Sequence, residues 1–275
     1  MKWCRFGFQI GFLLLIAVSA FAIGGNCEAW CPFGGVELLC TYIPEQSLTC
    51  SLASSNLYTL IALLGLTLVA GRAFCSWICP IGALSEWLGL LGNRTLSLRR
   101  EVPRWLDTIL SALKYPVAAL ILYFTYVVGE LVFRGFDPCY ALISRHGHEI
   151  TAWAYVALGA VLLGSLFVAL PFCRWLCPMA AVMNPVSFFG ILKPVRDPEL
   201  CLDCGKCDTV CPMAIPASKV EKIHHARCTA CLECTRACPE RSDRRRGLVK
   251  ASMILWRSAL SSSKVTNALP TPGAA

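Results

Sequence analysis

Two cysteine runs near the C-terminal end have a spacing typical of iron–sulfur ligands. Each reads C-x2-C-x2-C-x3-C-P, over 201–212 and again over 228–239. In bacterial two-cluster ferredoxins, three thiolates of each run bind one [4Fe-4S] cluster and the fourth binds the other cluster. The predicted ligand sets are Cys201, Cys204, Cys207 and Cys238 for one cluster, and Cys211, Cys228, Cys231 and Cys234 for the second. The alternative is structural zinc, but a zinc site needs four ligands and no C-x3-C-P tail.

A shorter motif, F-C-x-W-[IL]-C-P, occurs at 74–80 and again at 172–178. A proline disfavours helical backbone at the residue before it and is well suited to the first position of a new helix. Each motif is therefore predicted to join two helices, with the free N–H groups of the second helix facing the thiols. The thiols that would form an inner cluster at the membrane surface are Cys75, Cys79, Cys173 and Cys177. The alternative is a set of buried thiols that pack as small hydrophobic side chains.

The remaining cysteines leave two interpretations open. A looser C-x3-C-P copy spans 27–32, and the other cysteines expected on the outer side are Cys40, Cys50 and Cys139. In an oxidising compartment they would form disulfides, with Cys40–Cys50 as the natural pair. Alternatively, an outer cluster would use Cys27, Cys31, Cys139 and one of Cys40 or Cys50.

The elements that must position these thiols are strongly apolar. The chain has 275 residues, of which 56% are hydrophobic and only 15% charged, whereas a soluble domain has about a quarter charged. Four apolar stretches, about 6–23, 52–74, 109–130 and 152–171, each approach the ~20 residues that cross ~30 Å of hydrocarbon. The first stretch could instead be a cleaved signal peptide, because basic residues precede it and small residues end it.

The predicted fold class is therefore a membrane all-α protein with a small C-terminal α+β domain of the two-cluster bacterial-ferredoxin type. Residues 1–192 would form four transmembrane helices in two hairpins, 193–246 the ferredoxin-type domain, and 247–275 a flexible tail. Basic residues gather before the first helix, after the second and after the fourth, which places both termini and the ferredoxin-type domain in the cytoplasm. The expected location is the bacterial inner membrane, as a multi-pass protein.

The net charge of +8 follows this topology rather than a basic stripe on a soluble domain, so no nucleic-acid partner is predicted. The chain also contains neither a G-x-G-x-x-G nor a Walker motif.

The sequence resembles the membrane ferredoxin-type proteins of the NapH/MauN type. The residues that carry the resemblance are Gly71-Arg72-Ala73-Phe74-Cys75 through Pro80, Phe172 through Pro178, and the two ferredoxin runs. The proteins of this type belong to periplasmic nitrate reductase and methylamine-utilisation systems, and the resemblance extends from Met1 to about Arg246. It implies an electron-transfer subunit, such as part of a quinol dehydrogenase. Its partners would be membrane lipid, quinone and other redox subunits of ferredoxin or cytochrome type.

A second function fits the same residues. The clusters could donate electrons, or hold a partner, during cofactor assembly of a periplasmic redox enzyme, which would make the protein a maturation or anchoring factor. Cluster potentials range from about −700 to +450 mV, so the motifs are compatible with electron flow in either direction.

Overall fold

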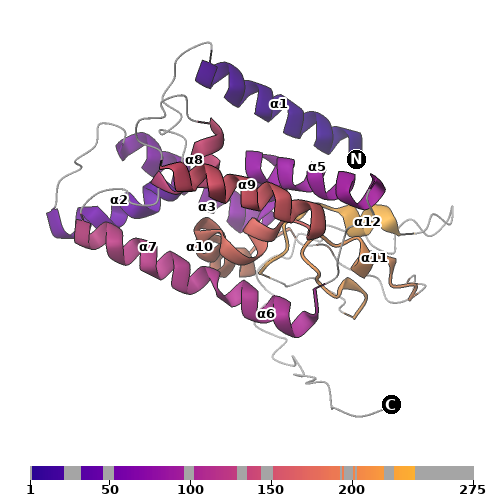
Figure 1. The fold of residues 1–275 in the computed structure, drawn as a ribbon. Coiled ribbons are helices and arrows are strands. Elements are labelled where there is room, and N and C mark those ends of the chain that lie inside the picture. The colour runs from indigo at the N-terminus through magenta and orange to yellow at the C-terminus, as the bar shows by residue number, and fades with distance from the viewer. Residues whose placement is uncertain are drawn as a thin grey trace, which may run out of the picture.

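The computed structural model describes residues 2–21, 32–45, 53–95, 102–128, 135–143, 151–192, 194, 201, 203–219 and 226–238. Long helices lie at each of the four predicted apolar stretches. They are α1 (Lys2–Phe21), α3 (Ala53–Ala70), the consecutive pair α6 (Arg104–Ala112) and α7 (Lys114–Val128), and α9 (Ala152–Phe167). Helix α1 runs along one side of the bundle and α6–α7 along the opposite side, with α8, α9 and α10 between them (Figure 1).

Shorter elements fill the space between the long helices. They are α2 (Pro32–Glu45), α4 (Ala73–Trp77), α5 (Pro80–Thr95), α8 (Pro138–Ile143), the π-helical turn η4 (Phe172–Leu176) and α10 (Pro178–Phe188). Helices α2, α5, α8 and α10 all begin at a proline, whose fixed φ and missing N–H suit the first helical position. The predicted helix starts at Pro80 and Pro178 are thus confirmed, whereas α2 and α8 were not predicted.

The C-terminal domain contributes α11 (Lys206–Thr209), the 3-10 turn η5 (Ala217–Lys219) and α12 (Glu233–Ala237). Helices α11 and α12 lie together at one end of the molecule, beside the N-terminus (Figure 1). Over the described ranges the regular elements are all helices and no strand occurs, so the β part of the expected α+β domain is not seen there.

The helices that follow the two C-x3-C-P motifs pack across the bundle. Helix α5 packs along α9, whereas α10 packs against α3 and α7. Helix α1 contacts α4, α5 and α8, and α7 contacts α2 and α10. The packing therefore differs from two simple hairpins of long helices, because the proline-initiated helices insert between them and interlock the two halves.

A close approach of backbones holds α5 against α9. A Cβ atom on Gly92 would lie 2.4 Å from the carbonyl oxygen of Leu166, and one on Gly89 would lie 3.2 Å from that of Ser165. Small residues at such positions let two helices approach closely, which matters most where lipid removes the hydrophobic force between helices.

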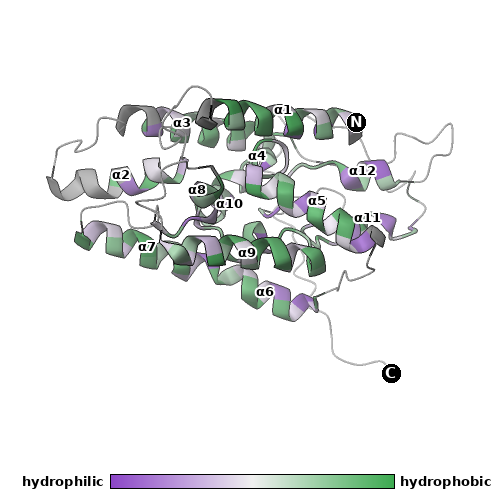
Figure 2. Cartoon of the chain, turned by 45° about the horizontal axis from the view of Figure 1, so that its top comes forward, coloured by the Kyte–Doolittle hydropathy of each residue, from purple (hydrophilic) through white to green (hydrophobic). Residues whose placement is uncertain are grey.

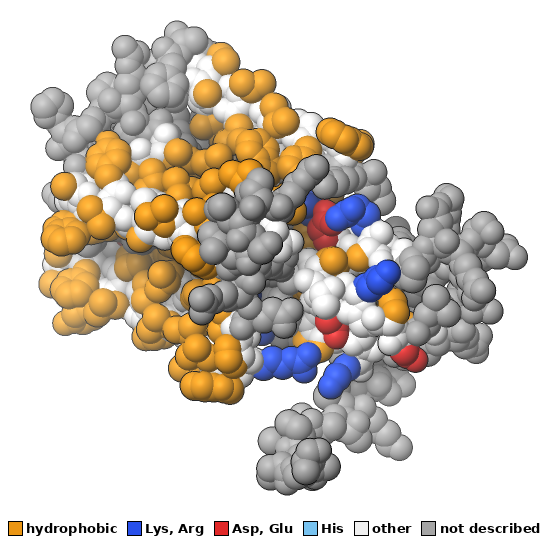
Figure 3. Space-filling view, turned by 45° about the vertical axis from the view of Figure 1, so that its right-hand side comes forward, with side chains coloured by type: hydrophobic (Ala, Val, Ile, Leu, Met, Phe, Trp, Pro, Cys, Tyr) orange, Lys and Arg blue, Asp and Glu red, His pale blue; other side chains and the backbone are white. Residues whose placement is uncertain are grey.

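The long helices show an inverted polarity, with polar side chains inside and apolar side chains outside. The buried polar set is Gln9, Thr67, Thr125 and Ser165, each 0% exposed. The apolar set that faces outward includes Leu15, Ile61, Val127 and Leu163, which are 58–64% exposed. Hydrophobic residues predominate along these helices (Figure 2), and the charged side chains gather at the end with α11 and α12 (Figure 3).

One described segment, Arg104–Val128, is both long and apolar enough to cross a membrane. The other apolar helical stretches are shorter, at Trp3–Val18, Asn56–Ala70 and Ala152–Phe167. The helices thus exist where they were predicted, while four membrane crossings remain a prediction.

We predict that Gly92→Ala destabilises the protein, because the new methyl group would collide with the backbone of α9. Overpacking of this kind costs about 1–3 kcal/mol. The matched control is Gly65→Ala on α3, where nothing lies within 4 Å of the added Cβ. Thermal unfolding in detergent, followed by circular dichroism, should show a lower midpoint for Gly92→Ala and an equal or higher one for Gly65→Ala. Equal midpoints for Gly92→Ala and the wild type would contradict the close packing of α5 on α9.

Candidate iron–sulfur site

The two cysteine runs share an unusual backbone conformation. Residues with positive φ flank the second cysteine of each run: Asp203 (49°) and Gly205 (65°) in the first, Ala230 (47°) and Leu232 (59°) in the second. For a residue other than glycine this conformation costs about 1–2 kcal/mol, and it persists where the surroundings require it. The shared pattern curls each loop around its cysteines, as a bound cluster would require.

The structure brings the fourth cysteine of the first run to the second run. Cys211, Cys228, Cys231 and Cys234 line one small cavity, which Met213 and Ile215 help to close. Burial, and then the nearby thiols Cys231, Cys228 and Cys211, raise the pKa of Cys234 to about 12. Burial likewise raises the pKa of Cys231 to about 11, so without a ligand Cys231 and Cys234 are neutral thiols, and binding of a metal would displace their protons.

The complementary set gathers around the end of the second run. Burial, followed by the neighbouring Cys204 and Cys201, raises the pKa of Cys238. Cys207 is 7% exposed and belongs to a buried core, and Cys238 packs against the same core. Cys238 thus lies near Cys204 and Cys201 of the first run, and Cys211 lies near the cysteines of the second run; the assignment of both crosswise sets as cluster ligands is our proposal.

No three described His, Cys, Asp or Glu side chains close into a group that could hold a single metal ion. Zinc would need its sulfur ligands at about 2.3 Å. A four-iron cluster is larger than one ion and accepts thiols that are spread more widely around a cavity.

The two short motifs share a backbone hydrogen bond across five residues, although the first is an α-helix and the second a π-helical turn. In the first, the N–H of Cys79 donates to the carbonyl oxygen of Phe74 at 2.9 Å; in the second, the N–H of Cys177 donates to that of Phe172, also at 2.9 Å. Cys177 is extended (φ −60°, ψ 117°), as expected for a residue before proline. The sequence repeat is therefore also a structural repeat.

The four thiols of these motifs come together in the bundle. Burial raises the pKa of Cys173 well above its usual range, and the adjacent Cys75, Cys79 and Cys177 raise it further. Burial likewise raises the pKa of Cys177 to about 12.

Cys79 differs from the other three thiols. A hydrogen bond from the thiol of Cys139 lowers its pKa, and the N–H groups of Gly82 and Ile81 in the first turn of α5 act in the same direction. These are the helix N–H groups that the Cys-Pro sequence predicted. Cys79 is therefore the member of the set best prepared to be a thiolate.

A buried guanidinium faces the four thiols. Arg72 is 0% exposed and donates to the carbonyl oxygen of Cys173 at 3.1 Å and to the side-chain oxygen of Asn184 at 3.0 Å. It also lies 3.9 Å from the sulfur of Cys75. No carboxylate of the described residues pairs with Arg72. Because an isolated buried charge is costly, this cation fits an anionic group bound among the thiols.

A second buried cation supports the same interpretation. Lys114 is 1% exposed, its Nζ has no hydrogen-bond partner within the described structure, and it lies close enough to Cys177 to interact electrostatically. The thiol set thus has the positive surroundings that a cluster of negative charge requires.

The ferredoxin-type domain sits directly on the first short motif. Ser76 Oγ donates to the carbonyl oxygen of Thr229 at 2.7 Å, and Trp77 Nε1 donates to that of Ala230 at 3.2 Å. From α1, Arg5 donates to the carbonyl oxygen of Cys231 at 2.8 Å and pairs with Glu233. The second cysteine run is thereby fixed to the bundle at three points.

The second short motif shares its core with the domain. Cys173 and Leu170 belong to the same buried cluster as Cys207 and Cys234. Ion pairs from Arg174 and Arg227 to Asp107, at 2.6 and 2.8 Å, brace the junction. The three thiol groups thus form one continuous region.

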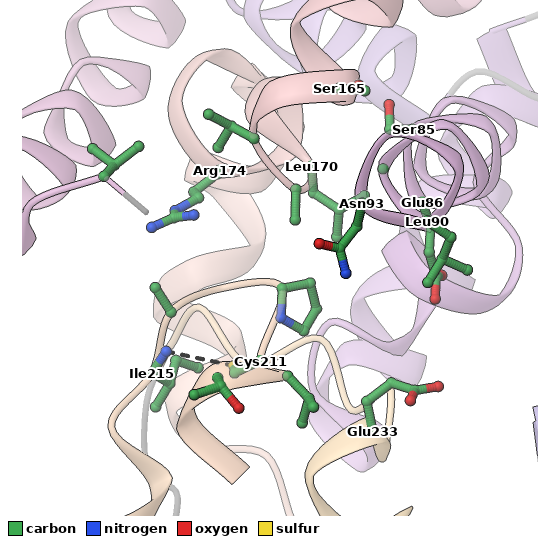
Figure 4. Close-up of a pocket in the computed structure, with 18 of the residues that line it drawn as sticks. Ser85, Glu86, Leu90, Asn93, Ser165, Leu170, Arg174, Cys211, Ile215 and Glu233 are labelled. Carbon is green, nitrogen blue, oxygen red and sulfur yellow. Dashed lines mark hydrogen bonds between the residues drawn. The ribbon is translucent and has the colours of Figure 1, made fainter. Parts of the chain in front are cut away.

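A larger cavity of about 700 Å³ opens where α5 and the end of α9 meet the first cysteine run. Figure 4 shows Ser85 and Ser165 on one side of it and Cys211 and Ile215 on the other. The hydroxyl of Ser85 is buried and has no hydrogen-bond partner within the described structure. Sequence reasoning missed this cavity because distant segments build it.

The outer cysteine set is described in part. Cys27, Cys31 and Cys50 lie outside the described residues, as does the side chain of Cys40 on α2. Cys139 is described, and it lies beside Cys79 rather than apart from the inner thiols. Sequence reasoning included Arg72 in the family resemblance but did not assign it to the thiol site, although it lies two residues before the first motif.

Comparison with known proteins supports this interpretation of the cysteines. A family model described as a 4Fe-4S binding domain matches residues 54–99 and 150–196, and a 4Fe-4S dicluster domain matches 193–239. The first of these models covers both short motifs, and the second covers both ferredoxin runs.

Several curated proteins are similar over much of the chain. YccM of Escherichia coli (strain K12) is 33% identical over 78% of this chain, which spans 62% of the length of YccM. The methylamine utilization ferredoxin-type protein MauN of Methylobacillus flagellatus is 29% identical over 68% of this chain and 66% of its own. The ferredoxin-type protein NapH of Escherichia coli (strain K12) is 25% identical over 87% of this chain and 85% of its own. No solved structure matches significantly.

We predict that serine variants of two cysteines from the same crosswise ligand set lose the same cluster. Cys211→Ser should remove the same electron paramagnetic resonance (EPR) signal as Cys231→Ser, and Cys238→Ser the same signal as Cys204→Ser, because each pair would serve one cluster. Iron analysis should show partial loss in each variant and none in the control Cys4→Ser, whose thiol is exposed on α1. If Cys211→Ser instead matched Cys204→Ser, each run would bind its own cluster and the crosswise assignment would be wrong.

Proposed function

The chain belongs to the NapH/MauN family of ferredoxin-type 4Fe-4S proteins, and we propose that it is a membrane-bound subunit that exchanges electrons between quinone and a redox partner. Iron–sulfur electron transfer is the common element of this family. The membrane location, the quinone and the ligand assignments are our proposals.

The observation that carries the proposal is the continuity of the thiol groups from the exposed end of the molecule into an inverted, apolar bundle. Cys204 is exposed, Cys234 is buried beside the short motifs, and Cys173 lies within the shared core. When bound, [4Fe-4S] clusters supply one-electron transfer. The protein holds the thiols, excludes water from the inner ones and balances their charge.

We assign the two ferredoxin-type clusters to the crosswise ligand sets. A third, inner iron–sulfur centre is assigned to Cys75, Cys79, Cys173 and Cys177, with Arg72 and Lys114 as its balancing cations. An anionic group bound by the four thiols would balance the two buried cations, whereas four neutral thiols would not. Among the described residues, no carboxylate pairs with Arg72 and no hydrogen-bond acceptor contacts Lys114 Nζ.

The inverted polarity of the long helices supports a membrane location. Ser165 and Thr125 are fully buried while Leu163 and Val127 face outward, the reverse of the pattern in a soluble bundle. Polar groups that face the interior of a bundle are typical of membrane proteins. We place the protein in the bacterial inner membrane, with both termini and the ferredoxin-type domain in the cytoplasm.

The cavity beside Cys211 is the proposed quinone site. It lies where the apolar helices end and the first cysteine run begins, so a lipid-soluble carrier could reach a proposed cluster ligand there. The side chain of Asn93, which is exposed at the cavity, offers hydrogen bonds to a quinone head group, and Leu90 and Leu170 provide apolar walls. The charged end with α11 and α12 would meet the redox partner (Figure 3).

We predict that Cys177→Ser lowers the iron content of the purified full-length protein while both ferredoxin-type EPR signals remain. One ligand of the inner centre would be lost, and the domain would be unaffected. Iron analysis against protein concentration, with Cys4→Ser as control, gives the result. Equal iron in Cys177→Ser and wild type would disprove the inner centre and leave the other two assignments standing.

We also predict that a short-chain quinol reduces the clusters of the anaerobic protein in lipid nanodiscs, followed by EPR. Asn93→Leu should slow this reduction about tenfold, because the change replaces a hydrogen-bonding amide at the cavity with an apolar side chain. Ser111→Leu, on the face of α6, is the control, and dithionite should reduce all variants equally. If the EPR signals of the wild-type clusters did not change with either quinol or quinone, quinone would not be the electron carrier of this protein.

A deletion strain separates this function from the maturation or anchoring alternative. An electron-transfer subunit should leave its partner enzyme fully active with an artificial donor. Loss of a maturation factor should leave the partner enzyme without its cofactor, which metal analysis of the purified partner would show.

A further inference from the structure

The segment 135–143 folds inward at the start of α9. Two donors of Thr151, its backbone N–H at 3.3 Å and its Oγ1 at 2.7 Å, hold the carbonyl oxygen of Gly135. The carboxylate of Asp137 accepts the N–H of Cys139 at 2.9 Å and so fixes the first turn of α8. Tyr140 and Ala141 pack against Ala154, so α8 is anchored on one side by α9.

This anchoring carries Cys139 to the inner thiols. Helix α8 also contacts α1 and α5, and the thiol of Cys139 hydrogen-bonds to Cys79 at the start of α5. The sequence had placed Cys139 on the outer side, away from the C-x3-C-P motifs. The segment instead connects the loop between α7 and α9 with the proposed inner centre.

We propose that Cys139 is a positioning residue of the inner centre, whose thiol donates a hydrogen bond to the sulfur of Cys79 and thereby raises the reduction potential of the centre. The proposal rests on the inner centre put forward above. Reduction adds negative charge to the ligand sulfurs, so a donor to one of them stabilises the reduced form more than the oxidised form. Hydrogen bonds to cluster sulfurs are one of the established determinants of cluster potential.

Donation suits Cys139 better than ligation does. The two copies of the motif already supply four thiols, and the same backbone hydrogen bond closes both copies, whereas Cys139 comes from a different kind of segment. Cys79 would bind the centre as a thiolate, which has no proton to donate, so in its hydrogen bond with Cys139 it is the acceptor and Cys139 keeps its proton.

The first test compares Cys139→Ala, Cys139→Ser and the control Cys4→Ala as full-length proteins. Iron content and the inner EPR signal, identified by its loss in Cys177→Ser, are measured during a redox titration. Cys139→Ala should keep its iron and show about a tenfold lower ratio of reduced to oxidised centre at a fixed potential, about 59 mV for one electron. Cys139→Ser should restore most of the shift because a hydroxyl also donates, and Cys4→Ala should behave as wild type.

Two results of this test would overturn the proposal. An inner signal with an unchanged midpoint in Cys139→Ala would show that the contact has no effect on the centre. Loss of the inner iron from Cys139→Ala would make Cys139 a ligand instead of a donor. If the wild type itself held no inner iron, its equality with Cys177→Ser would reveal this, and both the inner centre and the role of Cys139 would fall.

A second measurement tests the contact without iron. In protein stripped of metal and treated with a mild thiol oxidant, Cys79 and Cys139 should become linked, and peptide mass spectrometry should recover the joined peptides. The link should be absent in Cys139→Ser. Recovery of Cys79 linked only to Cys75, Cys173 or Cys177 would place Cys139 elsewhere and overturn the geometry.

Discussion

A buried guanidinium joins the two copies of the C-x3-C-P motif. Arg72 precedes the first copy, yet it donates to the carbonyl oxygen of Cys173 in the second and to Asn184 on the helix that follows. A positive charge in this position needs a nearby negative charge, and among the described residues the thiols Cys75, Cys173 and Cys177 lie close enough to interact with it. The interlocked packing of the helices and the chemistry proposed for their centre therefore depend on the same side chain.

The Cys-Pro step explains how the bundle can hold thiols in its interior. A helix that continued through each motif would leave its N–H groups bonded to its own carbonyl oxygens. Proline stops that pattern, and the new first turn offers the N–H groups of Ile81 and Gly82 to Cys79 and that of Ala180 to Cys177. The same break turns α5 and α10 against helices of the other half, so that one local rule produces both the donors and the interlocking.

The domain and the bundle form one continuous unit around the thiols. The Ser76 and Trp77 contacts belong to the residues between Cys75 and Cys79, so the loop that carries two inner thiols also receives the second cysteine run. Arg5 binds the same run from α1. The thiol groups are consequently positioned relative to each other by direct contacts, which is what transfer of electrons over short distances requires.

The sequence by itself determined the features that depend on local spacing. The cysteine runs indicated 4Fe-4S clusters, the apolar stretches predicted the four long helices, and Pro80 and Pro178 marked helix starts, because each follows from residues close together in the chain. The crossed ligand sets remain a prediction. Only the tertiary structure placed α5 against α9, Cys139 beside Cys79, and Arg72 among thiols of both copies. Hydropathy and charge predict which segment a residue belongs to, but contacts between segments depend on packing. A glycine that lets two backbones approach acts between parts of the chain that are far apart in the sequence. So does a buried charge that needs a partner.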